Sequence, residues 1–208
     1  MKAIINMFLF GIALVHTTNA VCGTELDIYA GAHGDAILID AGKRKTLLVA
    51  GGAVPWGAGT ASDCFAKATL SLKRKPDFYE GQLDSVHNEI IDVDPDSASG
   101  RLAGVYIYPS GIRIGNIEVD GICADGIDFS GDYKKVRQES AKYASAFAYF
   151  MRMEARNAEN IRKHDGRTAA NDILRPFIEA DYAKLRLDIQ DRKTVESILK
   201  KYKSMQRN

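Results

Sequence analysis

Apolar residues recur at every second position in the first half of the chain and at every third or fourth position in the second half. Residues 36–39 and 46–49 are short apolar runs separated by the polar, glycine-containing stretch 41–44, a pattern that predicts a β-hairpin. Residues 105–108 and 112–119 flank a Pro-Ser-Gly corner, which predicts a second hairpin because proline and glycine favour tight turns. The first half is therefore predicted to be antiparallel β structure.

The period becomes helical from Asp132 onward. Apolar side chains at helical spacing predict one long helix near 133–163. They are Val136, Tyr143, Phe147, Phe150, Ala158 and Ile161. A second helical stretch is expected over 168–188, where Pro176 would break or kink it, and a last one begins after Asp191.

Strands followed by helices favour an α+β fold over an alternating α/β fold. We expect a mostly antiparallel region of β-hairpins over residues 21–131. A helical region with one long helix, over residues 132–208, would pack on it as part of a single globular unit.

The first twenty residues have the layout of a secretory signal peptide. Lys2 provides a positive charge, residues 3–15 are almost wholly apolar, and Thr18 and Ala20 are small residues suited to a cleavage site. The apolar run is shorter than the roughly 20 residues that a spanning helix needs. We expect cleavage after Ala20, a periplasmic or secreted product and no transmembrane segment in the mature chain.

The mature chain has three cysteines. An oxidising compartment favours a disulfide, and we expect it between Cys64 and Cys123 because both lie inside patterned segments. Cys22 would then be the spare thiol. Whether Cys22 carries a lipid stays open, although Val21 stands where lipoprotein signals require a small residue.

The charge of the chain is balanced overall but divided between its two parts. Residues 21–131 hold 9 basic and 16 acidic residues, a net charge of −7, and residues 132–208 hold 18 basic and 11 acidic residues, a net charge of +7. Two parts that attract each other within one fold explain the division. A basic face for phosphate, nucleic acid or an acidic partner is the alternative, but no block of five like charges marks a nucleic-acid-binding arm.

The glycine-rich stretch 51–59 carries Trp56, the single tryptophan. An aromatic ring on such a loop buries much area at little entropic cost, so Trp56 is a candidate binding residue. The alternative is that Trp56 folds back as a lid over the core.

Sequence motifs for catalysis and for metal binding are missing. Asp92, Asp94 and Asp96 alternate as at the start of a calcium loop, but Ser97 and Ala103 stand where an EF-hand needs Gly and Glu. There is no G-x-S-x-G nucleophile elbow and no phosphate-binding P-loop. We therefore assign no catalytic residue, no metal site and no cofactor.

One stretch resembles a known family. Residues 34–39, followed by 45–49 and by Gly51 and Gly52, are similar to the opening hairpin of metallo-β-lactamase-like hydrolases. That family's zinc chemistry requires an H-x-H-x-D-H cluster. The mature chain has only His33, His87 and His164, all far apart in sequence, so no residue role is carried over.

These observations favour an exported, non-enzymatic binding or inhibitor-type protein, for example an immunity protein against an envelope toxin. Its partner would be another protein of the cell envelope rather than a nucleic acid. A small secreted hydrolase whose acid and base groups are scattered in the sequence is the alternative, and an envelope assembly subunit is a third. The sequence leaves the oligomeric state open.

Overall fold

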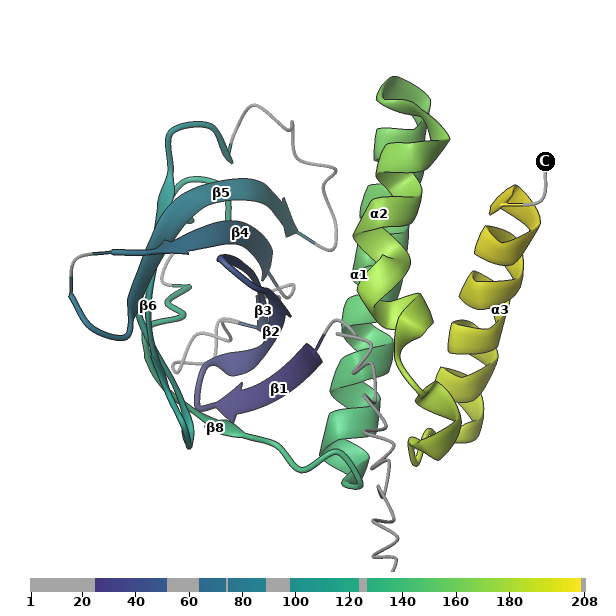
Figure 1. Ribbon diagram of the computed structural model, residues 1–208, viewed down its shortest axis with the longest axis horizontal. Helices are drawn as coiled ribbons and strands as arrows, with labels where there is room; N and C mark the ends of the chain where they lie inside the picture. The colour runs from purple at the N-terminus through teal and green to yellow at the C-terminus, as the bar shows by residue number, and fades with distance from the viewer. Residues whose placement is uncertain (1–24, 52–63, 74, 89–97, 124–126, 207–208) are drawn as a thin grey trace, which may run out of the picture.

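A computed structural model of the protein shows eight β-strands followed by a layer of helices (Figure 1). It describes residues 25–51, 64–73, 75–88, 98–123 and 127–206. The strands are β1 (Glu25–Gly31), β2 (Gly34–Ala41), β3 (Arg44–Gly51), β4 (Cys64–Leu72), β5 (Phe78–Asn88), β6 (Leu102–Tyr108), β7 (Gly111–Ile117) and β8 (Gly131–Lys135). The helices are α1 (Ala141–His164), α2 (Gly166–Glu179), the 3-10 turn η2 (Tyr182–Lys184) and α3 (Ile189–Gln206).

The eight strands form a closed antiparallel barrel in which each strand pairs with its neighbours in sequence. β1 closes the barrel by pairing with β8, with Tyr29 opposite Lys135 and Gly31 opposite Tyr133. The predicted fold class, a region of separate hairpins followed by a helical region with one long helix, is therefore wrong. Pairing between the first and last strands removes the free sheet edges, and three α-helices follow.

The interior of the barrel is filled by side chains from all eight strands. Alternate residues of each strand point inward and form one buried cluster that includes Leu38, Val49, Leu70, Ile112 and Tyr133. Small inward residues allow the walls to approach closely, and they are Ala36, Ala66, Ala68 and Ala103. The described part of the barrel is thus a packed core.

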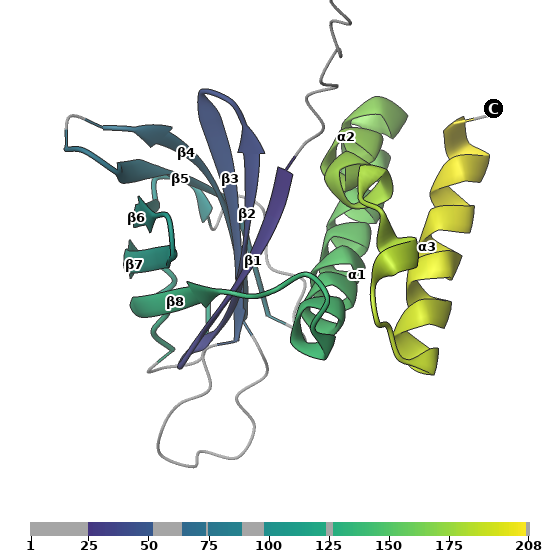
Figure 2. The same cartoon turned by 60° about the horizontal axis from the view of Figure 1, so that its bottom comes forward.

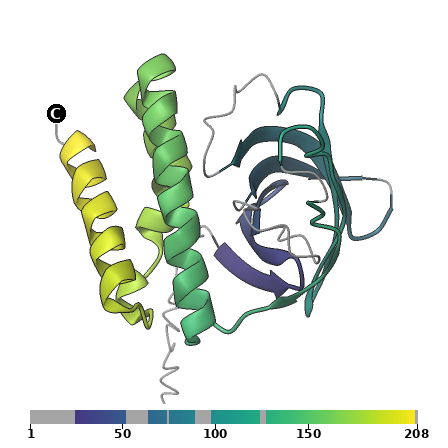
Figure 3. The same ribbon diagram turned by 180° about the vertical axis from the view of Figure 1, so that it is seen from behind.

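A second apolar cluster joins the outside of the barrel to the helices. Outward residues of β1 to β4, among them Ile28, Ile37, Leu48 and Phe65, pack against α1 and its neighbours. Figure 2 and Figure 3 show the helices on one side of the barrel only, with β6, β7 and β8 on the far side. Half of the barrel's outer wall is therefore covered by helices.

The helical layer begins later in the chain than the sequence predicts. Ser140 caps α1, because its hydroxyl accepts a hydrogen bond from the Tyr143 amide at 3.1 Å. Residues 131–135 belong to β8 instead, so the division expected between residues 131 and 132 falls inside a strand. Pro176 lies within α2. Within the described residues, none of the helices has the length and apolar composition needed to cross a membrane.

Cys64, at the beginning of β4, is bonded to Cys123, in the segment that follows β7. Their Cα atoms lie 5.8 Å apart and 59 residues separate them in the sequence. The bond fastens the segment between β7 and β8, whose Ile127 and Phe129 join the interior cluster. This is the pair that the sequence analysis expected.

Candidate functional site: a basic groove between α1 and α3

The two residues of greatest functional interest in the sequence lie outside the described residues. Trp56 and Cys22 both fall there, as do the three aspartates of the calcium-like stretch. The candidate site therefore has to be built from other parts of the chain.

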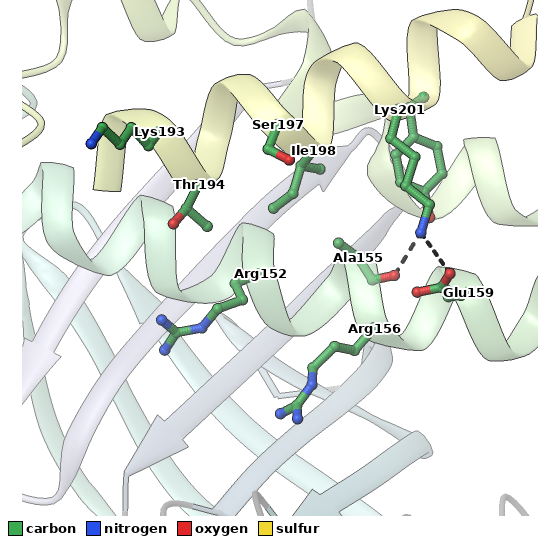
Figure 4. A pocket seen from close by; sticks show the side chains of 10 residues that line it. Arg152, Ala155, Arg156, Glu159, Lys193, Thr194, Ser197, Ile198 and Lys201 are labelled. Atoms are coloured by element: carbon green, nitrogen blue, oxygen red, sulfur yellow. Dashed lines mark hydrogen bonds and ion pairs between the residues drawn. The ribbon is translucent and has the colours of Figure 1, made fainter. Parts of the chain in front are cut away.

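A groove of about 440 Å³ runs between α1 and α3 (Figure 4). From α1 it is lined by Arg152, Ala155, Arg156 and Glu159, and from α3 by Lys193, Thr194, Ser197, Ile198, Lys201 and Tyr202. Four of these side chains are basic and one is acidic. The groove thus carries part of the excess positive charge counted in residues 132–208.

The helical repeat explains why these residues share one groove. Arg152 and Arg156 are four residues apart on α1, and Lys193 and Lys201 are eight apart on α3, so each pair lies on one face of its helix. The two helices run side by side in the same direction (Figure 1). In Figure 4 the guanidinium groups of Arg152 and Arg156 point to the same side of α1.

The floor of the groove is apolar. Tyr202 is buried, and its hydroxyl lies 3.4 Å from the carbonyl oxygen of Ala155. Ile198 is half-buried and packs against the small cluster that Tyr202 forms with Ala158 and Leu174. These contacts fix α3 on α1, so the charged side chains stand on a supported surface.

One cation of the groove is neutralised by a carboxylate. The Lys201 ammonium lies 2.5 Å from Glu159 Oε1. That hydrogen bond lowers the pKa of Glu159, and the charges of Lys201, Arg162 and Lys163 lower it further. Glu159 is therefore ionised at neutral pH and forms an ion pair with Lys201.

The other three cations lack such a carboxylate contact. Arg152 lies over the ring of Tyr149, 5.2 Å from its centroid, and influences the titration of Asp191 without an ion pair. For Arg156 and Lys193 the described residues contain neither an ion pair nor a hydrogen bond. The groove therefore presents three exposed cations without an ion pair among the described residues, although the Arg152 and Arg156 side chains extend away from α3 in Figure 4. These cations make the groove a candidate site for an anionic ligand.

A second groove, of about 690 Å³, lies where β1 and β8 meet the ends of α1 and α2. Its lining holds three acidic and two basic side chains: Lys135 lies 2.6 Å from Asp27 Oδ2, and the others are Arg137, Glu179 and Asp181. Tyr143 also lines it and donates a hydrogen bond to the Leu26 carbonyl at 3.0 Å. These contacts hold barrel and helices together, and the third acidic residue, Asp181, is paired with Lys184 outside the groove.

Two of the three histidines considered in the sequence, and Asp35 near one of them, have structural contacts. His33 Nδ1 lies 2.7 Å from the backbone oxygen of Asp128, and Asp35 pairs with Lys142 at 2.6 Å. His87 stacks on Phe65 with ring centroids 5.9 Å apart. Within the described ranges, no group of three or more His, Cys, Asp or Glu side chains is arranged to hold a metal ion.

The sequence analysis did not single out the groove residues. The charge division pointed to residues 132–208, where the groove lies, and the four-residue spacing of Arg152 and Arg156 was a usable signal. The meeting of α1 with α3 was not visible, because it joins residues about 40 positions apart. Comparisons with protein-family models, with curated proteins and with solved structures found no match.

Proposed function

We infer that this is an exported, non-enzymatic binding protein whose groove between α1 and α3 holds an acidic segment of a partner protein. An inhibitor or immunity protein of the cell envelope is a concrete form of this function. The observation that carries the proposal is the set of exposed cations Arg152, Arg156 and Lys193, none of which forms an ion pair with a carboxylate among the residues that the structure describes.

The energetic argument starts from the repulsion between these cations. Like charges held on one surface destabilise a fold slightly and are screened by salt. Folding therefore does not explain their position, whereas carboxylates from a partner would convert the repulsion into attraction. Arginine is well suited to this because its planar guanidinium binds a carboxylate through two hydrogen bonds.

The composition of the groove favours a protein segment over a nucleic acid. Ala155, Ile198 and Tyr202 offer an apolar floor, and Glu159 places a carboxylate on the rim. A phosphate backbone has no apolar side chains to fill that floor, since nucleic-acid affinity comes mainly from contacts between cations and phosphates. An acidic peptide with some apolar side chains matches both the rim and the floor.

Two observations support an extracytoplasmic location. The first twenty residues have the pattern of a signal peptide, and the disulfide between Cys64 and Cys123 suits an oxidising compartment. The location is tested by determining the N-terminus and the compartment of the native product. A product that begins at Val21 in the extracytoplasmic fraction supports export, and one that begins at Met1 among soluble intracellular proteins contradicts it.

Binding is tested with a synthetic acidic peptide of alternating Glu and Leu residues, titrated into the exported protein and followed by calorimetry. The double variant Arg152→Glu/Arg156→Glu is compared with Arg192→Glu/Lys200→Glu. The control makes the same change in charge at exposed positions of α3 that do not line the groove. We expect the groove variant to bind at least about tenfold more weakly, and the control to bind like the wild type.

Equal weakening in both variants would mean that net charge, not the groove, drives binding, and the proposal would fail. Preference for a single-stranded oligonucleotide over the peptide would contradict the assignment to a protein partner. Capture of partners from envelope extract by wild type, groove variant and control then identifies the natural ligand. The relevant partner is one that the wild type and control retain and the groove variant loses.

A further inference from the structure

The outer wall of the barrel has an uncovered half. The helices pack on β1 to β4, and β6, β7 and β8 face away from them in Figure 2 and Figure 3. Outward side chains on the uncovered strands have no helix to contact. Most should therefore be polar, as on the exposed face of an antiparallel sheet.

A row of outward residues crosses four strands of this uncovered half. Phe78 of β5 is the register partner of Tyr106 of β6. Tyr106 is opposite Arg113 of β7, and Arg113 is opposite Asp132 of β8. Two aromatic rings and one ion pair are thus neighbours in a single line across the sheet, which we call the aromatic row.

The rings of the aromatic row are continuous with Tyr108. The centroids of Phe78 and Tyr106 lie 4.8 Å apart, and Tyr106 and Tyr108 are parallel within 6° at 6.4 Å. Tyr108 is 41% exposed. Phe78 and Tyr106 are half-buried, so the three rings form one contiguous, partly exposed aromatic surface, and contiguous apolar surface is a common feature of binding sites.

The surface around the rings is shallow because two of its residues, Gly104 and Gly115, have no side chain. A Cβ atom at Gly104 would lie 3.2 Å from the Phe78 ring, so the absence of a side chain lets that ring lie against β6. Gly115 of β7 is exposed and likewise adds no side chain. The rings and the two glycines give a shallow surface rather than a deep cavity.

The polar end of the row is a bidentate ion pair between Arg113 and Asp132. Arg113 Nε and Nη2 donate to Asp132 Oδ1 and Oδ2 at 2.6 and 2.9 Å. Asp132 raises the pKa of Arg113, and nearby Tyr108 adds to this effect. The pair is exposed and so contributes little to stability, but it holds donors and acceptors in fixed positions beside the rings.

We propose that the aromatic row binds an uncharged oligosaccharide chain. Pyranose rings present C–H groups on their faces and hydroxyl groups at their edges. The C–H groups suit the faces of Tyr106 and Tyr108, and the hydroxyls suit the remaining donors and acceptors of Arg113 and Asp132. This site is separate from the basic groove and does not rest on the function proposed for it.

The charge of the row distinguishes this ligand from the alternatives. Arg113 and Asp132 cancel one another, so the row does not have the unopposed cations that single-stranded nucleic acid or an anionic membrane requires. An exposed ion pair next to the rings also differs from the charge-depleted centre of a protein–protein interface. Lys75, 5.9 Å from the Phe78 ring centroid, and Lys134, the register partner of Gly111 opposite Tyr108, add positive charge beside the rings. The salt dependence of binding therefore has to distinguish an uncharged chain from an anionic one.

The test is a titration of the full chain with chitohexaose, cellohexaose and laminarihexaose, followed by calorimetry at low and high salt. The variants are Tyr108→Ala and Arg113→Gln, both at exposed positions. Leu72→Ala is the matched control, because Leu72 is 58% exposed on the neighbouring β4 and lies outside the row. Thermal unfolding of each variant checks that the fold is retained.

We expect at least one of the three hexasaccharides to bind, with an affinity that salt does not change. Tyr108→Ala and Arg113→Gln should each weaken binding at least about tenfold, and Leu72→Ala should leave it unchanged. Failure of all three sugars to bind at millimolar concentration would overturn the proposal. So would equal loss in the control, or binding of only an anionic chain such as a hyaluronan hexasaccharide that high salt abolishes.

Discussion

Lys67 of β4 and Glu154 of α1 form an ion pair across the interface between the barrel and the helices, with Nζ 2.6 Å from Oε2. Glu154 is only 1% exposed, whereas the Lys67 side chain retains 14% exposure. Asn157 Nδ2 lies 3.4 Å from the other Glu154 oxygen, and the rest of the interface between the barrel and the helices includes a large apolar cluster. The pair therefore fixes the position of α1 on the barrel more specifically than apolar contacts alone.

The unequal burial of the two partners predicts an asymmetry between single substitutions. Lys67→Met leaves a carboxylate buried without its cation and should lower the free energy of unfolding by about 3–5 kcal/mol. Glu154→Leu should cost less, because the Lys67 ammonium can reach solvent through its flexible stem. The double variant should lie within about 1 kcal/mol of the wild type, since apolar replacement of a buried pair is often neutral. Urea unfolding of all four proteins measures this, and equal costs for the two single variants would contradict it.

The disulfide gives a second prediction. It links residues 59 positions apart, and a loop of that length is expected to contribute about 4 kcal/mol, mainly by restricting the unfolded chain. Cys64→Ala/Cys123→Ala should lower the urea midpoint by a corresponding amount. Reductant should shift the wild type in the same direction and leave the double variant unchanged. A variant that unfolds at the wild-type midpoint would show that the bond does not stabilise the barrel.

Alkaline pH should destabilise the protein through Tyr143. Burial raises the pKa of its hydroxyl to about 12, with a further contribution from the charge of Asp27. Between about pH 10 and pH 12 the unfolded chain loses this proton while the folded protein keeps it. The contribution of Tyr143 to the free energy of unfolding should therefore be constant below pH 10 and fall by up to about 1.4 kcal/mol per pH unit above it.

Tyr143→Phe is the control for this titration. It removes the ionisation together with the hydrogen bond to Leu26, so it should cost about 1 kcal/mol at pH 8. Its stability should then decline less steeply than that of the wild type above pH 10, with buried Tyr133, whose pKa burial also raises, accounting for part of the remaining slope. Parallel pH profiles for wild type and variant would refute the assignment to Tyr143.

The sequence predicted individual strands better than their assembly, and the strand patterns show why. Residues 36–39 of β2 are continuously apolar because one face lies inside the barrel and the other lies under the helices. In β7, by contrast, Ile112 and Ile114 are buried and Arg113 between them is exposed, because its outer face is uncovered. Local patterns thus record which faces are buried, but not which strand is the partner.

These local patterns could not predict that the barrel closes. Closure depends on contacts such as Tyr29 with Lys135, which pair the first strand with the last. The short β8 strand has one glycine and three charged residues around Tyr133, so its alternation merges with the helical pattern that follows. The groove was missed for a similar reason, since its two walls come from separate helices.

The cations of the groove allow a stability test that separates a binding role from a structural one. Arg156 and Lys193 are exposed and, within the part of the chain that the structure describes, have no ion pair. Arg156→Gln and Lys193→Gln should therefore change the free energy of unfolding by no more than about 0.5 kcal/mol, and relief of repulsion favours a small gain. Lys201→Gln removes the pair with Glu159 and should cost up to about 1 kcal/mol. Urea unfolding at low salt measures all three, and a loss above about 1.5 kcal/mol at Arg156 or Lys193 would show that the fold itself requires these charges.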